Sequence, residues 1–311
     1  MAVTVREHAP RATALGPWLV ALGAGLWGTE SAWRIPLNDL FEADVIVWWE
    51  HVVLVALALP FVLPRLHELR RVSPRAIGWL IFSGVSGSAV GTVLFTMALK
   101  HGNESIANVV LNVQPVLSTT AACLLFKDRL APAFFPWAVL AIAAGVALVV
   151  DPSTGFTVDG SVPYAFGCAV FWGLSTVAGR GVMTEMSLPL AAGLRVIVGL
   201  VTMTITIAAL GHLDADSLWP ATASAASTTA IEWLVLLATL SGGIPLVIYF
   251  AGLARTRAST AGYFEMMQTI VAVGITWGFF DAPLARYQVF AALVLVGAVA
   301  MVQHAQASIG E

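Results

Sequence analysis

The sequence predicts an all-α membrane protein with ten transmembrane helices, arranged as two inverted five-helix repeats. Three observations lead to this prediction: the scarcity of charge, the length of the apolar runs, and an internal similarity between the two halves of the chain. Of the 311 residues, 59% are hydrophobic and only 11% are charged. A water-soluble domain has about twice that share of charged residues. The mean hydropathy is +0.86.

Ten apolar runs are long enough to cross a bilayer, whose hydrocarbon core requires roughly 20 apolar residues per helix. We expect membrane helices at residues 13–32, 44–64, 76–98, 105–126, 131–150, 163–183, 188–210, 230–252, 258–280 and 286–303. The apolar residues run continuously and do not alternate, which favours helices over a β-barrel. A cleaved signal peptide is the weaker interpretation of the first run, because nine similar runs follow it.

The distribution of Lys and Arg predicts the orientation. With the N-terminus inside, the inner segments hold eleven of these residues and the outer segments hold three. Both termini are therefore expected in the cytoplasm, and the protein in the cytoplasmic (inner) membrane. The expected organisation is a tail at 1–12, a first repeat at 13–150, an outer linker at 151–162, a second repeat at 163–303 and a C-terminal tail at 304–311.

The two halves of the chain are similar in sequence. A shift of 154 residues places Ser105 on Ser259 and Gln114 on Gln268, and a shift of 145 places Trp27 on Trp172. Five helices per repeat is an odd number, so the two halves must lie in opposite orientations. Inverted repeats with a binding site near their interface are typical of secondary transporters.

Several short motifs resemble one known family. They are Leu26-Trp27-Gly28, Ala98-Leu99, Pro115 and the turn Lys127-Asp128-Arg129-Leu130. Together they resemble the EamA type of the drug/metabolite transporter (DMT) superfamily over about residues 13–303. The resemblance implies a central cavity between helices one to four and six to nine, with helices five and ten at the periphery. Members move amino acids, nucleobases, sugars and other metabolites, often outward, so the fold names no substrate.

The sequence departs from that family at one position. Members commonly have an arginine in the second and seventh spans, whereas here the shift of 145 pairs Glu50 with Arg195. A charge within a span costs a few kcal/mol or more, on the order of 3, so each is a candidate functional residue. With a rise of 1.5 Å per residue, Arg195 and Glu265 lie at similar depths, roughly 10 Å from the inner boundary. We expect them to pair, either as a structural bridge or as a gate or substrate contact.

Glu50 is expected to have no basic partner in any span, with Arg34 able to reach it only from the outer loop. An isolated carboxylate in a low dielectric favours its protonated form, so Glu50 is our candidate for proton coupling or for binding a cationic solute. A packing role remains the alternative. His51 points about 100° away from Glu50 and is expected to pack. Glu30, Glu104 and Glu232 are expected to extend to the interface.

Uncharged candidates for substrate binding come in repeat-related pairs. Gln114 and Gln268 lie near mid-membrane, where a buried amide needs a partner that a solute or another helix can supply. Trp27 and Trp172 can form aromatic faces of a cavity or anchor the protein at the interface. Tyr249 and Tyr263 are weaker candidates. Asn112 and Gln114 are about 200° apart on an ideal helix, so both are not expected to line one cavity.

The expected function is a secondary transporter that moves a small polar metabolite by alternating access, with or without proton coupling. An amino acid or an organic cation or amine is favoured. Two alternatives are an intramembrane serine protease, suggested by the GxSG pattern at Gly84–Gly87, and a non-transporting receptor or scaffold. No metal or phosphate-binding motif is present, and Cys123 and Cys168 form no redox motif. We expect no cofactor and no nucleic acid. The expected partners are a solute and the lipid bilayer, with a homodimer through the peripheral helices left open.

Overall fold

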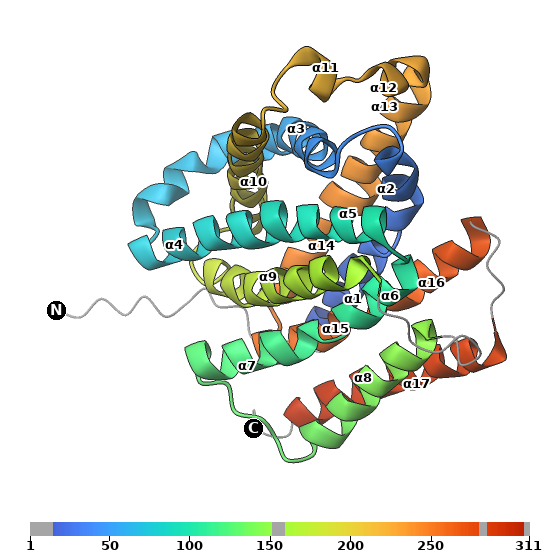
Figure 1. The fold of residues 1–311 in the computed structure, drawn as a ribbon. Coiled ribbons are helices and arrows are strands. Elements are labelled where there is room, and N and C mark those ends of the chain that lie inside the picture. Colours follow the sequence, from blue (N-terminus) through green and yellow to red (C-terminus); the bar gives the residue numbers. More distant parts are fainter. Residues whose placement is uncertain (1–14, 151–158, 280–284, 308–311) are drawn as a thin grey trace.

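The computed structural model describes residues 15–150, 159–279 and 285–307, and the regular elements in those ranges are all helical (Figure 1). The fold class predicted from the sequence, an all-α membrane protein, is confirmed. The expected tail at 1–12, most of the linker at 151–162 and the last residues of the tail at 304–311 lie outside the described residues.

Within the described residues, seven helical stretches are long and apolar enough to cross a membrane. They are Ala43–Arg71, Pro74–His101, Ile106–Phe126, Ser161–Val182, Leu188–Leu210, Ser227–Leu253 and Arg286–Ala307. A shorter apolar helix, α8 (Phe134–Val149), falls in the expected fifth span. The expected first and ninth spans are each divided, into α1 (Leu15–Trp27) and α2 (Glu30–Asn38), and into α15 (Ala258–Glu265) and α16 (Met267–Phe279).

The remaining elements follow in chain order. They are α3 (Ala43–Val62), the 3₁₀-helix η1 (Leu63–Arg71), α4 (Pro74–Ser83), the π-helical turn η2 (Gly84–Val90), α5 (Gly91–His101), α6 (Glu104–Leu111), α7 (Gln114–Phe126), α9 (Ser161–Val182), α10 (Leu188–Leu210), α11 (Ala215–Leu218), α12 (Ala221–Ala225), α13 (Ser227–Leu236), the π-helical turn η3 (Leu237–Gly243), α14 (Ile244–Leu253) and α17 (Arg286–Ala307).

Local sequence explains several helix ends. Ser73 precedes α4, and its hydroxyl accepts a hydrogen bond from the Ala76 N–H at 3.2 Å, with Pro74 as the first helical residue. Lys127 ends α7 in the left-handed conformation, with φ of 57°. Gly211 ends α10 with φ of 82°, a conformation that glycine adopts without steric cost.

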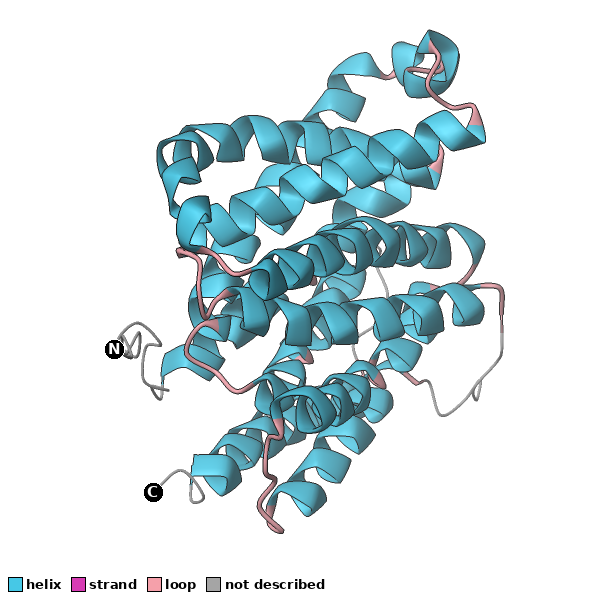
Figure 2. Ribbon diagram, turned by 90° about the vertical axis from the view of Figure 1, so that its left-hand side faces the viewer, coloured by secondary structure: helices cyan, strands magenta, loops and turns pink. Residues whose placement is uncertain are grey.

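The helices pack in a pattern that relates the two repeats. The most extensive helix contacts are α8 with α17, α1 with α14, α3 with α10, α5 with α9 and α7 with α15 (Figures 1 and 2). Two of these pairs, α8 with α17 and α3 with α10, join a helix to its counterpart in the other repeat, and α7 with α15 joins the expected fourth and ninth spans, which are counterparts. The remaining two pairs, α1 with α14 and α5 with α9, are equivalent to each other, because α9 is the counterpart of α1 and α14 is the counterpart of α5. The packing is therefore that of a pseudo-symmetric pair of halves.

Irregularities in the helices are also repeated. The π-helical turns η2 and η3 begin at Gly84 and Leu237, 153 residues apart. The breaks that follow Leu111 in α6 and Glu265 in α15 lie 154 residues apart. A π-turn contains one more residue than an α-turn and is frequently found at functional sites. The break between α1 and α2 has no counterpart, because α9 is continuous.

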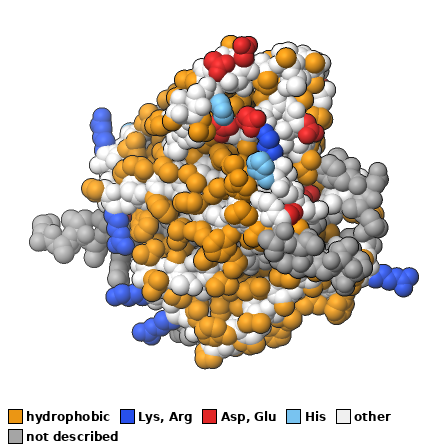
Figure 3. All heavy atoms as spheres, viewed as in Figure 1, with side chains coloured by type: hydrophobic (Ala, Val, Ile, Leu, Met, Phe, Trp, Pro, Cys, Tyr) orange, Lys and Arg blue, Asp and Glu red, His pale blue; other side chains and the backbone are white. Residues whose placement is uncertain are grey.

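Apolar side chains are spread over the face of the molecule that Figure 3 shows. On α8 and α17, Val139, Phe290 and Leu293 each expose about two thirds of their surface, at 66%, 69% and 68%. A water-soluble protein rarely presents so much contiguous apolar surface, whereas lipid tails solvate it. Between the helices, small residues occupy the contacts and allow the backbones to approach closely.

Candidate transport site

A cavity lies between the two repeats, with about 680 Å³ of empty space inside it and at its opening to solvent. Helices from both repeats line it, and α8 and α17 contribute none of its described residues. Eight of the nine residues predicted as site residues line this cavity. They are Trp27, Glu50, Gln114, Trp172, Arg195, Tyr249, Glu265 and Gln268.

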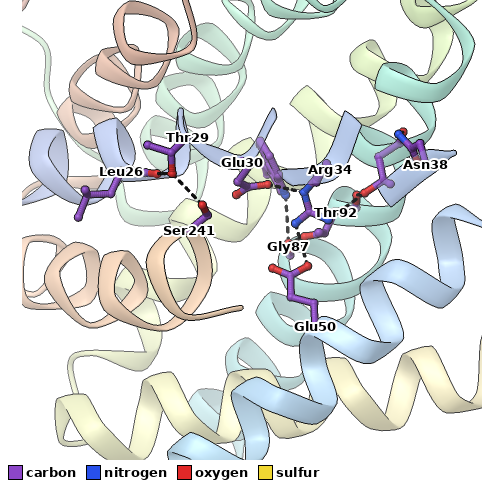
Figure 4. A network of polar contacts seen from close by, with 11 residues as sticks. Leu26, Thr29, Glu30, Arg34, Asn38, Glu50, Gly87, Thr92 and Ser241 are labelled. Carbon is purple, nitrogen blue, oxygen red and sulfur yellow. Dashed lines mark hydrogen bonds and ion pairs between the residues drawn. The ribbon is translucent and has the colours of Figure 1, made fainter. Parts of the chain in front are cut away.

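The first charged group of the cavity centres on Arg34, which is fully buried in α2 (Figure 4). Its Nε donates to Glu30 at 2.7 Å, its Nη2 to Glu50 at 2.8 Å and its Nη1 to Thr96 at 3.1 Å. We refer to Glu30, Arg34, Glu50 and Thr96 as the Arg34 cluster. The cluster ties α2 to α3 and α5, and all three of its charged residues line the cavity.

The break after α1 positions this cluster. Thr29 donates to the Leu26 carbonyl at 2.7 Å and shares a hydrogen bond of 2.7 Å with Ser241 on η3 (Figure 4). A Cβ added at Gly28 would lie 2.5 Å from the Gln268 carbonyl, so glycine allows the break to approach α16. The chain then resumes as α2 with Glu30 and Arg34 four residues apart, the spacing at which helical side chains meet.

The predictions for Glu50 and Glu30 are therefore wrong in two respects. Glu50 has a basic partner, because the helical segment continues to Asn38 and buries Arg34 instead of leaving it in an outer loop. Glu30 does not extend to the interface, since only 5% of its surface is exposed. Mutual neutralisation lets this polar stretch remain in the protein interior, an effect that hydropathy alone does not reveal.

Glu265 forms the second charged group, on α15. Its Oε1 accepts from Tyr249 at 2.7 Å and from Thr176 at 2.9 Å, and its Oε2 accepts from the Gln114 amide. We refer to Glu265, Tyr249, Thr176 and Gln114 as the Glu265 cluster. All of the described donors to this carboxylate are uncharged.

Arg195 does not form the predicted direct pair with Glu265. Within the described residues, no Arg195 nitrogen lies within 4.0 Å of a carboxylate oxygen, and its buried Nε has no hydrogen-bond partner. The guanidinium lies over the Phe250 ring, 5.5 Å from the centroid. Both residues line one cavity, but both carboxylate oxygens of Glu265 accept hydrogen bonds from neutral donors.

The predicted aromatic residues separate into two groups. Trp27 packs against Tyr249 with centroids 4.7 Å apart, and Trp172 donates its indole N–H to the Gly87 carbonyl at 3.0 Å. All three rings line the cavity. Tyr263 does not: its ring packs against Phe134 in the hydrophobic core, with centroids 5.3 Å apart.

Gln114 and Gln268 both line the main cavity, and both also line a smaller adjoining cavity of about 270 Å³ together with Asn112. The prediction that Asn112 and Gln114 cannot line one cavity is wrong. It assumed a continuous helix, whereas α6 ends at Leu111 and α7 begins at Gln114. The break changes the angle between the two side chains.

Ser86, the serine of the GxSG pattern, does not bond a histidine in the described residues. Ser86 donates to the Phe82 carbonyl at 2.6 Å. His51 instead contacts Ser88 at 2.8 Å and the Val47 carbonyl at 2.7 Å. In the described ranges, no group of three His, Cys, Asp or Glu residues is placed to hold a metal ion.

Sequence reasoning did not identify three cavity residues with prominent interactions: Glu30, Arg34 and Thr176. The four-residue spacing of Glu30 and Arg34 was the available signal, since opposite charges so placed can share one helix face. Thr176 gave no signal, because a lone threonine in a span commonly bonds its own backbone. Here it does so with the Trp172 carbonyl at 3.2 Å and also reaches Glu265.

Two known proteins are similar to this chain over most of its length. A curated relative, the riboflavin transporter ImpX of Fusobacterium nucleatum subsp. nucleatum, is 22% identical over 296 residues, covering 90% of this chain and 95% of that protein. A solved crystal structure superposes with a TM-score of 0.70 at 20% identity, covering 96% of this chain and all of the other, so the two share a fold.

The profile of the EamA-like transporter family matches twice, at residues 14–151 and 160–303, and so recovers the two repeats. The resemblance stated from the sequence motifs is thereby confirmed. This chain belongs to the EamA-like transporter family and is a multi-pass membrane transporter, not an enzyme.

Proposed function

We propose that the protein is a secondary transporter that moves a small polar metabolite by alternating access, with the central cavity as its binding site. The observation that supports this most directly is that both repeats contribute buried charged residues to one cavity. Ten spans in two inverted halves, as in other transporters built from repeats, would let one half rock against the other around this site. The exchange-symmetric packing of the helices supports that arrangement.

The proposed orientation places both termini in the cytoplasm, with the protein in the inner membrane. Most Lys and Arg side chains visible in Figure 3 gather on the left edge, towards which α4 begins and α7 ends (Figure 1). Arg34, counted as an outer residue from the sequence, is buried in the cavity. The bias then becomes eleven inner against two outer basic residues.

Labelling tests this orientation. In a variant with Cys123 and Cys168 replaced by alanine, single cysteines at positions 68 and 215 are exposed to an impermeant thiol reagent in intact cells. The cysteine at 215 should react and the one at 68 should not, whereas the reverse pattern would overturn the orientation. A third position suggested by the sequence, 155, lies outside the described residues.

We propose that the Arg34 cluster couples transport to protons. Two buried carboxylates share one guanidinium, so the cluster has one net negative charge when all groups are ionised and is neutral with one proton added. The other ionisable groups lining the cavity are His51, Arg195, Tyr249 and Glu265. Proton uptake by Glu30 or Glu50 would change the charge that a solute meets in the same cavity.

The solute is proposed to be an amino acid or another small polar metabolite. An organic cation or amine is also proposed, because the cavity has one net negative charge when its carboxylates and guanidinium groups are all ionised. Riboflavin is a second candidate: it is the solute named for the curated relative, and Trp27 and Trp172 line the cavity as faces for a flat ring.

Counterflow in proteoliposomes that contain only this protein tests the proposal. Vesicles preloaded with an unlabelled amino acid, amine or riboflavin should accumulate the matching labelled compound, and empty liposomes should not. Uptake that requires ATP, or no exchange with any of the three classes, would contradict it. A homodimer through α8 and α17 is also proposed, and light scattering of the purified protein would detect it.

A further inference from the structure

The cavity contains two arginines, and only one of them has its hydrogen bonds satisfied by protein. Arg34 donates to Glu30, Glu50 and Thr96. Arg195 is 9% exposed, lines the cavity, and has no hydrogen bond or ion pair with any described residue. A guanidinium has five N–H donors, and a buried one is strongly unfavourable without partners, so the donors of Arg195 are available to a group that enters the cavity.

The surroundings of Arg195 hold it in place without a direct ion pair, and the charge of Glu265 acts on it across the cavity. Phe250 lies beneath the guanidinium, an arrangement that stabilises a cation while leaving its N–H edges free. A Cβ built on Gly87 would lie 2.7 Å from Arg195 Nη2, so the glycine on η2 makes the space that the guanidinium occupies. The side chain is thus fixed at the cavity wall.

We infer that Arg195 binds the carboxylate of the transported solute. This inference rests on the proposed function, since it assigns one chemical group of the solute to one wall of the same cavity. A guanidinium and a carboxylate form two parallel hydrogen bonds, the geometry that best satisfies a planar fork of donors. A phosphate dianion fits less well, because the second arginine of the cavity is already paired with two carboxylates.

The charges of the cavity also specify the rest of the solute. Glu30, Glu50 and Glu265 face Arg34 and Arg195, so the cavity has one net negative charge when all five groups are ionised. A purely anionic solute would increase that charge, whereas a zwitterion leaves it unchanged. Glu265, with only uncharged partners, is the counter-ion for the cationic end. The solute that fits best therefore has a carboxylate for Arg195 and an ammonium group for Glu265.

Thermal unfolding of the purified full-length protein tests this assignment with three probes: L-phenylalanine, L-phenylalaninamide, which lacks the carboxylate, and riboflavin. Phenylalanine should raise the melting temperature of the wild-type protein more than the amide does. Arg195→Gln should weaken phenylalanine binding at least tenfold and leave the response to the amide unchanged. Arg195→Lys should bind with intermediate affinity, because an ammonium keeps the charge without the fork.

Arg180→Gln is the matched control. Arg180 lies on α9, also has a buried nitrogen without a partner, but is outside the set of residues that line the cavity. This variant should bind phenylalanine as the wild type does. A ligand-free measurement gives a second test: removing an unpaired buried charge should leave the melting temperature of Arg195→Gln at or above that of the wild type.

Three results would overturn the inference: a ligand-free Arg195→Gln protein that melts far below the wild type, equal binding of phenylalanine by variant and wild type, or a wild-type protein that the amide or riboflavin stabilises and carboxylates do not. A wild type that none of the probes stabilises would count against it as well. Carboxylate binding that depends on Arg195 but is accompanied by no counterflow would instead refute transport by alternating access and leave Arg195 as a carboxylate site.

Discussion

The Arg34 and Glu265 clusters both line one cavity, but their buried charges have different partners. In the Arg34 cluster a guanidinium holds two carboxylates within 2.8 Å, and the protein satisfies its own charges. In the Glu265 cluster a carboxylate takes only neutral donors, while Arg195 nearby remains unpaired. Charges of the first kind are held by the protein's own ion pairs, and charges of the second kind are available to a ligand.

This difference indicates that the role of a charged residue in a membrane span depends on its interaction partners more than on its depth in the membrane. Arg34 and Arg195 are both buried arginines lining the same space. Burial alone does not distinguish them, yet removing Arg34 should destabilise the fold and removing Arg195 should weaken ligand binding. The following variants test this distinction, beginning with the largest expected effect, and the last examines a carboxylate outside both clusters.

Arg34→Gln should be the most destabilising change. It leaves Glu30 and Glu50 buried without their counter-ion, at a cost of about 3–5 kcal/mol in the free energy of unfolding. Thermal unfolding in detergent measures this loss. The neutral triple variant Glu30→Gln, Arg34→Met, Glu50→Gln should recover most of the stability, because it removes the charges together. A melting temperature for Arg34→Gln equal to that of the wild type would erase the distinction between the two arginines.

Gly87→Ala should disturb the position of Arg195 without altering any charge. The added methyl group would lie 2.0 Å from Ser175 Oγ and 2.7 Å from Arg195 Nη2, so these side chains must move. Overpacking of this kind costs about 1–3 kcal/mol. Gly78→Ala is the matched control, since a Cβ there meets nothing within 4 Å. Chemical denaturation measures the stability of both variants. Equal stability would show that η2 accommodates the added methyl group without displacing Arg195.

Glu50→Gln should alter coupling more than stability. It leaves Glu30 and Arg34 as a neutral pair, which has no reason to take up a proton. In proteoliposomes the variant should still exchange solute by counterflow but no longer accumulate it in response to a pH gradient. Glu232→Gln, which changes an exposed carboxylate on α13, serves as the control. Unchanged accumulation driven by the pH gradient would show that the Arg34 cluster is purely structural.

Asp214 provides a carboxylate outside both clusters and should show the smallest effect. The hydroxyl and backbone N–H of Ser217 bond this carboxylate at the start of α11 and hold its pKa below the ordinary value. A lowered folded-state pKa adds stability that is fully present above the unfolded value, about 3.9, and is lost as pH falls through the folded value.

Hydrogen exchange at the Asp216 and Ser217 amides measures this local stability. Both N–H groups bond Asp214 and should lose protection only in acid, below about pH 4. Asp214→Asn should remove that pH dependence while leaving the cavity unaffected. Protection that falls near neutral pH would point to a different titrating group.

Most of the fold could be predicted from the sequence, because each membrane span requires a long apolar run. The residues of the cavity were readable because polar side chains in such runs are rare, and Trp27 and Trp172 also matched across the repeats. The breaks at Gly28 and Asn112 were not foreseen. They depend on close contacts with other helices, such as Gly28 against the Gln268 carbonyl, which hydropathy does not encode.

The pairing of charges was the least predictable part. Helical rise gives the depth of Arg195 and Glu265 but not the direction in which each side chain points around its helix. The same reasoning missed Arg34 because a polar stretch of sequence is ordinarily a loop. It becomes a buried helix here only through Glu30 and Glu50, which lie on different helices.

The matched π-turns η2 and η3 also record the history of the chain. A π-turn arises when one residue is inserted into a helix that keeps its flanking contacts. The two turns occupy equivalent positions in the two repeats, so a single insertion in a half-length ancestor explains both more simply than two separate events. A half-length chain has no second half to enclose such a cavity, so two copies would have to assemble to form one. The gene duplication then freed the copies to diverge, and the break after Trp27 and the arginine at position 195 are each present in only one of them.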